Sequence, residues 1–162
     1  MFGEIFNFIV TGVIAGIVGT IVMDTLNYLF SKVGTLSKIE PEMIGRMVVG
    51  WGRGRFVYRH PSEMEEVANE KVYGLAAHYF IGIGLAVPFV LSWGVITEKS
   101  LSHLWIFIYG VATTAASWFF VYPCIGFGAF GRLSPDGLRA TLSSLANHIF
   151  YGVGLAIGIA FI

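Results

Sequence analysis

The chain has 162 residues, of which 56% are hydrophobic and 12% are charged, and its formal net charge is zero. Its mean hydropathy of +0.74 is too high for a soluble domain, which needs polar residues to cover its core. The balanced charge creates no basic surface, which argues against nucleic acid as a partner. The single cysteine, Cys124, cannot form a disulfide within the chain. These features predict an integral membrane protein.

Four stretches reach the length of about 20 apolar residues that a helix needs to cross a bilayer. They are residues 5–30, 72–96, 104–125 and 142–162. The expected fold is therefore all-α, with a bundle of four transmembrane helices that forms a single transmembrane domain over residues 1–162.

Basic residues are distributed unequally among the three segments that join these spans. Seven of the ten Lys and Arg residues lie in the first joint, 31–71, and two lie in the third, 126–141. The second joint, 97–103, contains only Lys99. By the positive-inside rule, the first and third joints are expected to be cytoplasmic, with both termini outside.

The first joint contains a short amphipathic pattern. After Pro41, apolar side chains recur at helical spacing until a glycine-rich cluster begins at Gly50. The apolar positions are Met43, Ile44, Met47, Val48 and Trp51. We expect a short amphipathic helix here, lying on the inner membrane surface.

A second helix signal follows in the same joint. Ser62 and Glu65 have the spacing of a capping box, in which a hydroxyl and a carboxylate satisfy the first backbone N–H groups of a helix. The pattern predicts a helix that begins at Ser62 and continues into the second span.

Three ionisable residues, Asp24, His78 and His148, lie inside three of the predicted spans. Each is about six or seven residues from the predicted cytoplasmic end, which corresponds to a depth of roughly 9 to 10 Å. A charged side chain at a helix centre in hydrocarbon costs about 2.5 to 3.5 kcal/mol, so such residues face a bundle interior or a wet cavity. We therefore expect these three side chains to form one metal or proton site.

One carboxylate and two imidazoles are compatible with several kinds of chemistry. They can bind a divalent transition metal or relay a proton, and His78 and His148 can serve as axial ligands of haem b. A structural role, in which Asp24 hydrogen-bonds one histidine and joins two helices, explains the same residues without a ligand. Secondary polar candidates are Asn27, Arg46, His60 and Glu70.

The functional hypothesis that follows is metal- or proton-linked handling or transport of a small solute or ion. Alternatives are a b-type haem electron-transfer subunit, a membrane enzyme acting on lipid or quinone, and an accessory subunit of a membrane complex. The sequence has no HExxH, GxSxG or Walker lysine pattern, and its one GxGxxG, Gly126 to Gly131, follows a predicted span instead of a strand, so whether the protein is an enzyme stays open. We expect the chain to contact membrane lipid and to form a homo-oligomer or join a larger membrane complex.

Short motifs follow one another in a fixed order through most of the chain. They are Gly-x-x-Gly-Thr-x-x-Met-Asp ending at Asp24, Gly45-Arg46, His60, Glu70-x-x-x-Gly-x-x-His78-Tyr, and His148-x-x-x-Gly-x-Gly-Leu. This series resembles an uncharacterised bacterial family of small four-span membrane proteins, the domain of unknown function 2938. The resemblance implies a bacterial cytoplasmic (inner) membrane and makes the ionisable residues family features, but it implies no activity. Where the family pattern leads us to expect Gln-Pro, this chain has Tyr122-Pro123.

Overall fold

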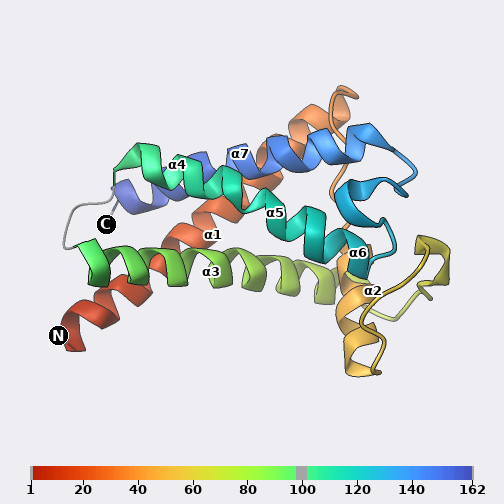
Figure 1. The fold of residues 1–162 in the computed structure, drawn as a ribbon, viewed down its shortest axis with the longest axis horizontal. Coiled ribbons are helices and arrows are strands. Elements are labelled where there is room, and N and C mark those ends of the chain that lie inside the picture. The colour runs from red at the N-terminus through yellow and green to blue at the C-terminus, as the bar shows by residue number, and fades with distance from the viewer. Residues whose placement is uncertain (1, 98–101, 162) are drawn as a thin grey trace. The chain divides into compact units, whose positions relative to one another are not determined.

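The structure is a computed structural model that describes residues 2–97 and 102–161. Regular structure in these residues is helical throughout, and four helices are long and apolar enough to cross a membrane (Figure 1). They are α1 (Phe2–Lys32), α3 (Glu70–Thr97), the segment His103–Cys124, and α7 (Leu138–Ala160). The predicted all-α fold with four apolar helices is therefore confirmed. Most of the predicted second joint, including Lys99, lies outside the described residues.

The third apolar segment is not one continuous α-helix. It consists of α4 (His103–Ala112), α5 (Thr114–Ala116), the π-helical turn η2 (Ser117–Val121) and α6 (Tyr122–Cys124). Pro123 has no backbone N–H and cannot make the usual bond to the carbonyl four residues earlier. The wider turn directly before α6 accommodates this missing bond.

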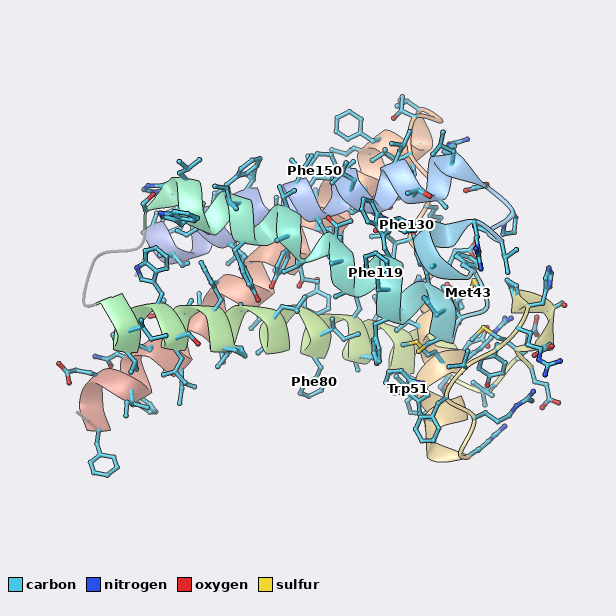
Figure 2. All side chains as sticks on the ribbon, in the orientation of Figure 1. Met43, Trp51, Phe80, Phe119, Phe130 and Phe150 are labelled. Atoms are coloured by element: carbon cyan, nitrogen blue, oxygen red, sulfur yellow. The ribbon has the colours of Figure 1, made fainter. Side chains whose placement is uncertain are left out.

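Large apolar side chains on the spans face outward. Phe80 of α3 is 74% exposed and projects away from its helix, and Phe119 of η2 is 58% exposed (Figure 2). Water would contact these rings in a soluble protein, whereas lipid tails accommodate them. Their exposure supports a membrane location for the apolar helices.

The chain divides into two compact units. Unit 1 contains 1–26, 79–113 and 147–162, and unit 2 contains 27–78 and 114–146. Helices α1, α3 and α7 each contribute residues to both units.

Glycines allow the helices of unit 1 to pack backbone against backbone. A Cβ atom added to Gly154 of α7 would lie 2.7 Å from the Cα of Gly19, and one added to Gly16 of α1 would lie 2.7 Å from the Cα of Ile83. Lipid tails are as apolar as leucine, so helices in a membrane associate through such close packing rather than through the hydrophobic effect. The small residues therefore set the spacing of α1, α3 and α7 within this unit.

Hydroxyl groups reinforce this packing. Tyr151 of α7 donates a hydrogen bond of 2.5 Å to the carbonyl oxygen of Gly82, and Tyr109 of α4 donates one of 2.6 Å to that of Leu85. Both acceptors lie on α3, so two phenols from different helices bind the same helix.

Unit 2 has a core in which four of the five buried residues lie outside the four apolar helices. Buried residues of this core are Met47, Tyr58, Met64, Cys124 and Ile125. The predicted amphipathic helix is confirmed as α2 (Pro41–Gly52), and its apolar side chains pack against this core. The ring of Trp51 also lies 5.8 Å from that of Phe120. Protein side chains therefore pack against part of this apolar face, and the position of α2 on the inner membrane surface stays a prediction.

The predicted capping box does not begin a helix. Residues Pro61–Glu63 form only a 3-10 turn (η1), in which Nδ1 of His60 accepts the Ser62 N–H at 3.3 Å. Asn69 then adopts a positive φ of 59°, and α3 begins at Glu70, whose carboxylate accepts the Val67 N–H at 3.0 Å. The prediction was wrong because His60 caps the turn and Asn69 redirects the chain.

The glycine packing gives a stability prediction. Gly154→Ala places a methyl group against the backbone of α1 and is expected to lower the free energy of unfolding by about 1 to 3 kcal/mol. Gly84→Ala is the matched control, because nothing lies within 4 Å of its added Cβ. It is expected to stabilise α3 by up to about 1 kcal/mol. Thermal unfolding in detergent measures both, and equal midpoints for the two variants would contradict the packing described here.

Candidate functional site

Asp24 of α1 is half-buried and interacts with Tyr79 of α3. The Tyr79 hydroxyl makes a side-chain hydrogen bond with the Asp24 carboxylate, and both residues belong to unit 1. The close approach of α1 and α3 that Gly16 permits brings these two side chains together. One turn before Asp24, the Thr20 hydroxyl donates to the Gly16 carbonyl oxygen at 2.8 Å and so needs no partner on another helix.

His148 of α7 is buried, with 9% of its surface exposed. Its Nδ1 lies 2.8 Å from Oγ1 of Thr113, and the same hydroxyl donates to the Gly110 carbonyl oxygen at 2.5 Å. Which of these two groups donates to the other depends on the histidine tautomer. A neutral imidazole has one nitrogen with a lone pair, which can accept a proton or bind a metal.

The described residues do not provide a metal-binding cluster. Asp24 and His148 lie in unit 1, whereas the half-buried His78 lies in unit 2. Among residues 2–97 and 102–161, no three His, Cys, Asp or Glu side chains are grouped as metal ligands. The predicted metal site therefore has no support from the geometry. A site that unites Asp24, His78 and His148, and haem ligation by the two histidines, stay predictions.

Arg46 and Glu70 form a bidentate ion pair between α2 and the start of α3. Arg46 Nε lies 2.8 Å from Oε2 of Glu70, and Nη2 lies 2.8 Å from Oε1. Both side chains are largely buried. The hydrogen bonds that Arg46 donates to Glu70 raise the pKa of Arg46 above its usual value, so the guanidinium is always charged. Such two-point pairs fix both distance and orientation. Glu70, one of the secondary polar candidates, is therefore a structural partner of Arg46.

Glycines make this crossing possible. A Cβ atom at Gly45 of α2 would overlap the carbonyl oxygen of Glu70, and one at Gly74 of α3 would overlap that of Pro41. The two helices thus meet backbone to backbone at their crossing. The ion pair between Arg46 and Glu70 joins the same two helices.

The other two secondary candidates hold loops in place. Asn27 is 3% exposed, and its side-chain amide donates to the Ser37 carbonyl oxygen and accepts the Ile39 N–H, each at 3.0 Å. His60 is exposed, and its Nδ1 lies 2.8 Å from Oγ of Ser62. Both residues organise the backbone of the first joint.

Sequence reasoning did not identify Tyr79 and Thr113 as partners of the candidate residues. Tyr79 directly follows His78 in the quoted motif series, and Thr113 begins a Thr-Thr pair inside an apolar segment. Both signals are visible in the sequence. Their meaning depends on which helices pack together, which the sequence pattern does not specify.

The family model described as "Protein of unknown function (DUF2938)" matches residues 13–162, which is most of the chain. The match confirms the resemblance that the ordered motifs indicated. No curated protein and no solved structure matches the chain. The candidate residues must therefore be interpreted from their own geometry.

The ion pair between α2 and α3 gives a second prediction. Glu70→Gln removes the carboxylate and leaves the largely buried Arg46 guanidinium without its bidentate partner. We expect a lower thermal unfolding midpoint and faster amide hydrogen exchange in α2. Glu66→Gln is the control, since that carboxylate is 86% exposed and lies 3.6 Å from Arg46, where an exposed pair contributes little. If both variants behave alike, the Arg46–Glu70 pair does not hold α2 in place.

Proposed function

We propose that this chain, which belongs to the DUF2938 family of proteins of unknown function, binds and releases protons within the membrane and uses them to handle or transport a small solute or ion. The observation that carries the proposal is the hydrogen bond between Asp24 and Tyr79 within membrane-spanning helices. Ionisable residues in such helices are costly and commonly serve ion or proton pathways.

A tyrosine hydroxyl is a suitable partner for a carboxylate that changes its protonation state. When Asp24 is ionised, the Tyr79 hydroxyl donates to the carboxylate. When Asp24 is protonated, its new O–H can donate and the phenol oxygen can accept. The hydrogen bond thus remains available in both states, which a lysine or arginine partner would not provide.

His148 is the second proposed proton carrier of unit 1. Its Nδ1 is held by Thr113, which fixes the orientation of the ring, and a neutral imidazole can accept a proton. A single side chain can carry a proton, whereas a metal site needs several ligands grouped together. A proton-linked role therefore fits the described residues better than a metal-linked one. His78 stays a candidate through its position beside Tyr79.

The proposal includes a membrane topology and an assembly state. The excess of Lys and Arg in 31–71 and 126–141 supports their placement on the cytoplasmic side of a cytoplasmic membrane. Exposed aromatic and aliphatic side chains on the spans support contact with lipid or with further copies of the chain.

Proton movement in lipid vesicles tests the function. Purified protein is reconstituted with a pH-sensitive dye inside, and a potassium diffusion potential drives protons inward. The wild-type protein is expected to acidify the vesicles faster than protein-free vesicles, and Asp24→Asn to abolish this difference. Tyr79→Phe is expected to slow it about tenfold, the effect of losing one hydrogen bond to a charged group. Asp136→Asn makes the same change at an exposed loop carboxylate and is the matched control.

The wild type and Asp24→Asn must be compared at equal amounts of folded protein in the vesicles. Equal proton movement by the two would contradict the role of Asp24. Wild-type movement no faster than that of protein-free vesicles would contradict the proposed function as a whole.

A further inference from the structure

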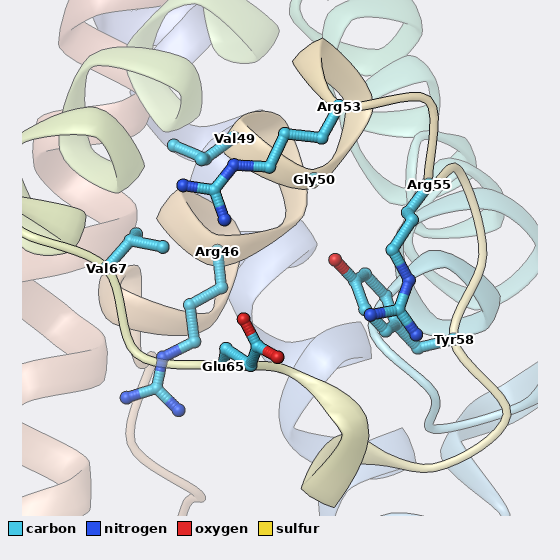
Figure 3. A pocket seen from close by; sticks show the side chains of 8 residues that line it. All are labelled: Arg46, Val49, Gly50, Arg53, Arg55, Tyr58, Glu65 and Val67. Carbon is cyan, nitrogen blue, oxygen red and sulfur yellow. The ribbon is translucent and has the colours of Figure 1, made fainter.

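Unit 2 contains a pocket that is rich in arginine. The pocket has about 270 Å³ of open space at the end of α2, and its lining includes Arg46, Arg53 and Arg55 (Figure 3). Three arginines around one pocket are typical of sites that bind oxyanions, because each guanidinium presents N–H groups in a planar fork. The position is outside all four apolar helices.

The end of α2 fixes the positions of two of these arginines. The Gly54 N–H binds the Trp51 carbonyl oxygen at 3.0 Å, and the Arg55 N–H binds that of Gly50 at 2.9 Å. Gly54 itself has φ of 80°. With the two hydrogen bonds, this makes the end of α2 a Schellman motif that has glycine in the left-handed position. Arg53 and Arg55, on either side of this glycine, are held on an ordered turn.

The three arginines differ in whether a carboxylate neutralises their charge. Arg46 is engaged by Glu70, as described above. Arg53 and Arg55 form no ion pair with a carboxylate in the described parts of the chain, and both are exposed. The Arg55 guanidinium lies over the Tyr58 ring, 5.0 Å from its centroid, which orients it without neutralising its charge.

Tyr58 provides the second observation. Its side chain lines the same pocket, and the residue is only 6% exposed. Its hydroxyl points toward Gly50, where an added Cβ would overlap it, and it has no hydrogen-bond partner among residues 2–97 and 102–161 (Figure 3). The hydroxyl is not among the fully buried unpaired polar atoms of the described residues, so it is open to the pocket and can donate to a ligand oxygen.

From this geometry we infer that the pocket binds a phosphate group, with Arg53 and Arg55 as charged donors and Tyr58 as a neutral donor. Arg46 contributes positive potential while it remains bound to Glu70. The Glu65 carboxylate lines the same pocket and repels an anion, so it limits the affinity. The phosphate can belong to a lipid headgroup or to a soluble phosphate ester, since the apolar helix α3 begins at Glu70, three residues after the lining residue Val67.

Two binding measurements on the full chain separate these sources. In a phosphate-free maltoside detergent, calorimetric titration with inorganic phosphate and with glycerol 3-phosphate measures binding of soluble anions. In nanodiscs that contain phosphatidylcholine and phosphatidic acid, native mass spectrometry of the released protein measures which lipid is retained. Binding in the first experiment indicates a soluble ligand, and selective retention of phosphatidic acid without soluble binding indicates a lipid headgroup.

Four variants tie the binding to this pocket. Arg55→Gln and Tyr58→Phe are each expected to weaken phosphate binding about tenfold, as for the loss of one charge-assisted hydrogen bond. Glu65→Gln is expected to strengthen it, a gain that a misfolded protein cannot show. Arg132→Gln removes an exposed arginine from another loop of unit 2 and is expected to have no effect.

The inference is overturned by a wild-type protein that binds neither soluble phosphate nor phosphatidic acid selectively. It is equally overturned if the binding observed is unchanged in Arg55→Gln, Tyr58→Phe and Glu65→Gln. Neither result depends on proton movement by Asp24, so this inference can fail while the proposed function stands, and the reverse.

Discussion

Close contact between helix backbones is the constraint on which unit 1 depends. Helices gain little from apolar burial when lipid is the alternative environment, so their association requires surfaces that fit closely. Gly16, Gly19 and Gly154 provide these surfaces by removing the Cβ atoms that would keep the helices apart. At this spacing Tyr79 reaches Asp24, and Tyr151 reaches a backbone carbonyl oxygen of α3. The polar contacts of the proposed proton site are thus consequences of glycine packing.

Unit 2 is stabilised by different interactions, as expected for residues that lie largely in the joints between apolar helices. Its core contains the buried side chains of Met47 and Met64, and the bidentate pair of Arg46 with Glu70 fixes α2 against α3. Helix α2 ends at glycines and is followed by Arg53 and Arg55, neither of which pairs with a carboxylate in the part of the chain that the structure describes. The two units therefore suit the separate tasks proposed for them, with the proposed proton carriers among the apolar helices of unit 1 and the proposed anion pocket in unit 2.

The sequence predicted those features that depend on local composition. Span lengths follow from apolar runs, and the bounds of α2 follow from Pro41 at its start and the glycines at its end. The capping-box prediction failed because two competing features, the His60 cap and the turn at Asn69, act through geometry that a spacing rule does not contain.

The candidate site also depends on geometry that the local sequence pattern does not contain. Counting residues along a helix estimates depth, so Asp24, His78 and His148 could be assigned a similar height. It does not give the direction in which each side chain points, nor which helix faces it. The partners Tyr79 and Thr113 were therefore not predictable, although both were present in the sequence.

The central claim is that Asp24 exchanges a proton while the protein remains folded in a membrane. Infrared difference spectroscopy of the reconstituted protein measures this directly, with Asp24→Asn identifying the carboxyl band that belongs to Asp24. The account predicts that this band changes between its ionised and protonated forms over the same pH range in which proton movement changes. A carboxyl group that keeps one protonation state throughout that range would contradict the account.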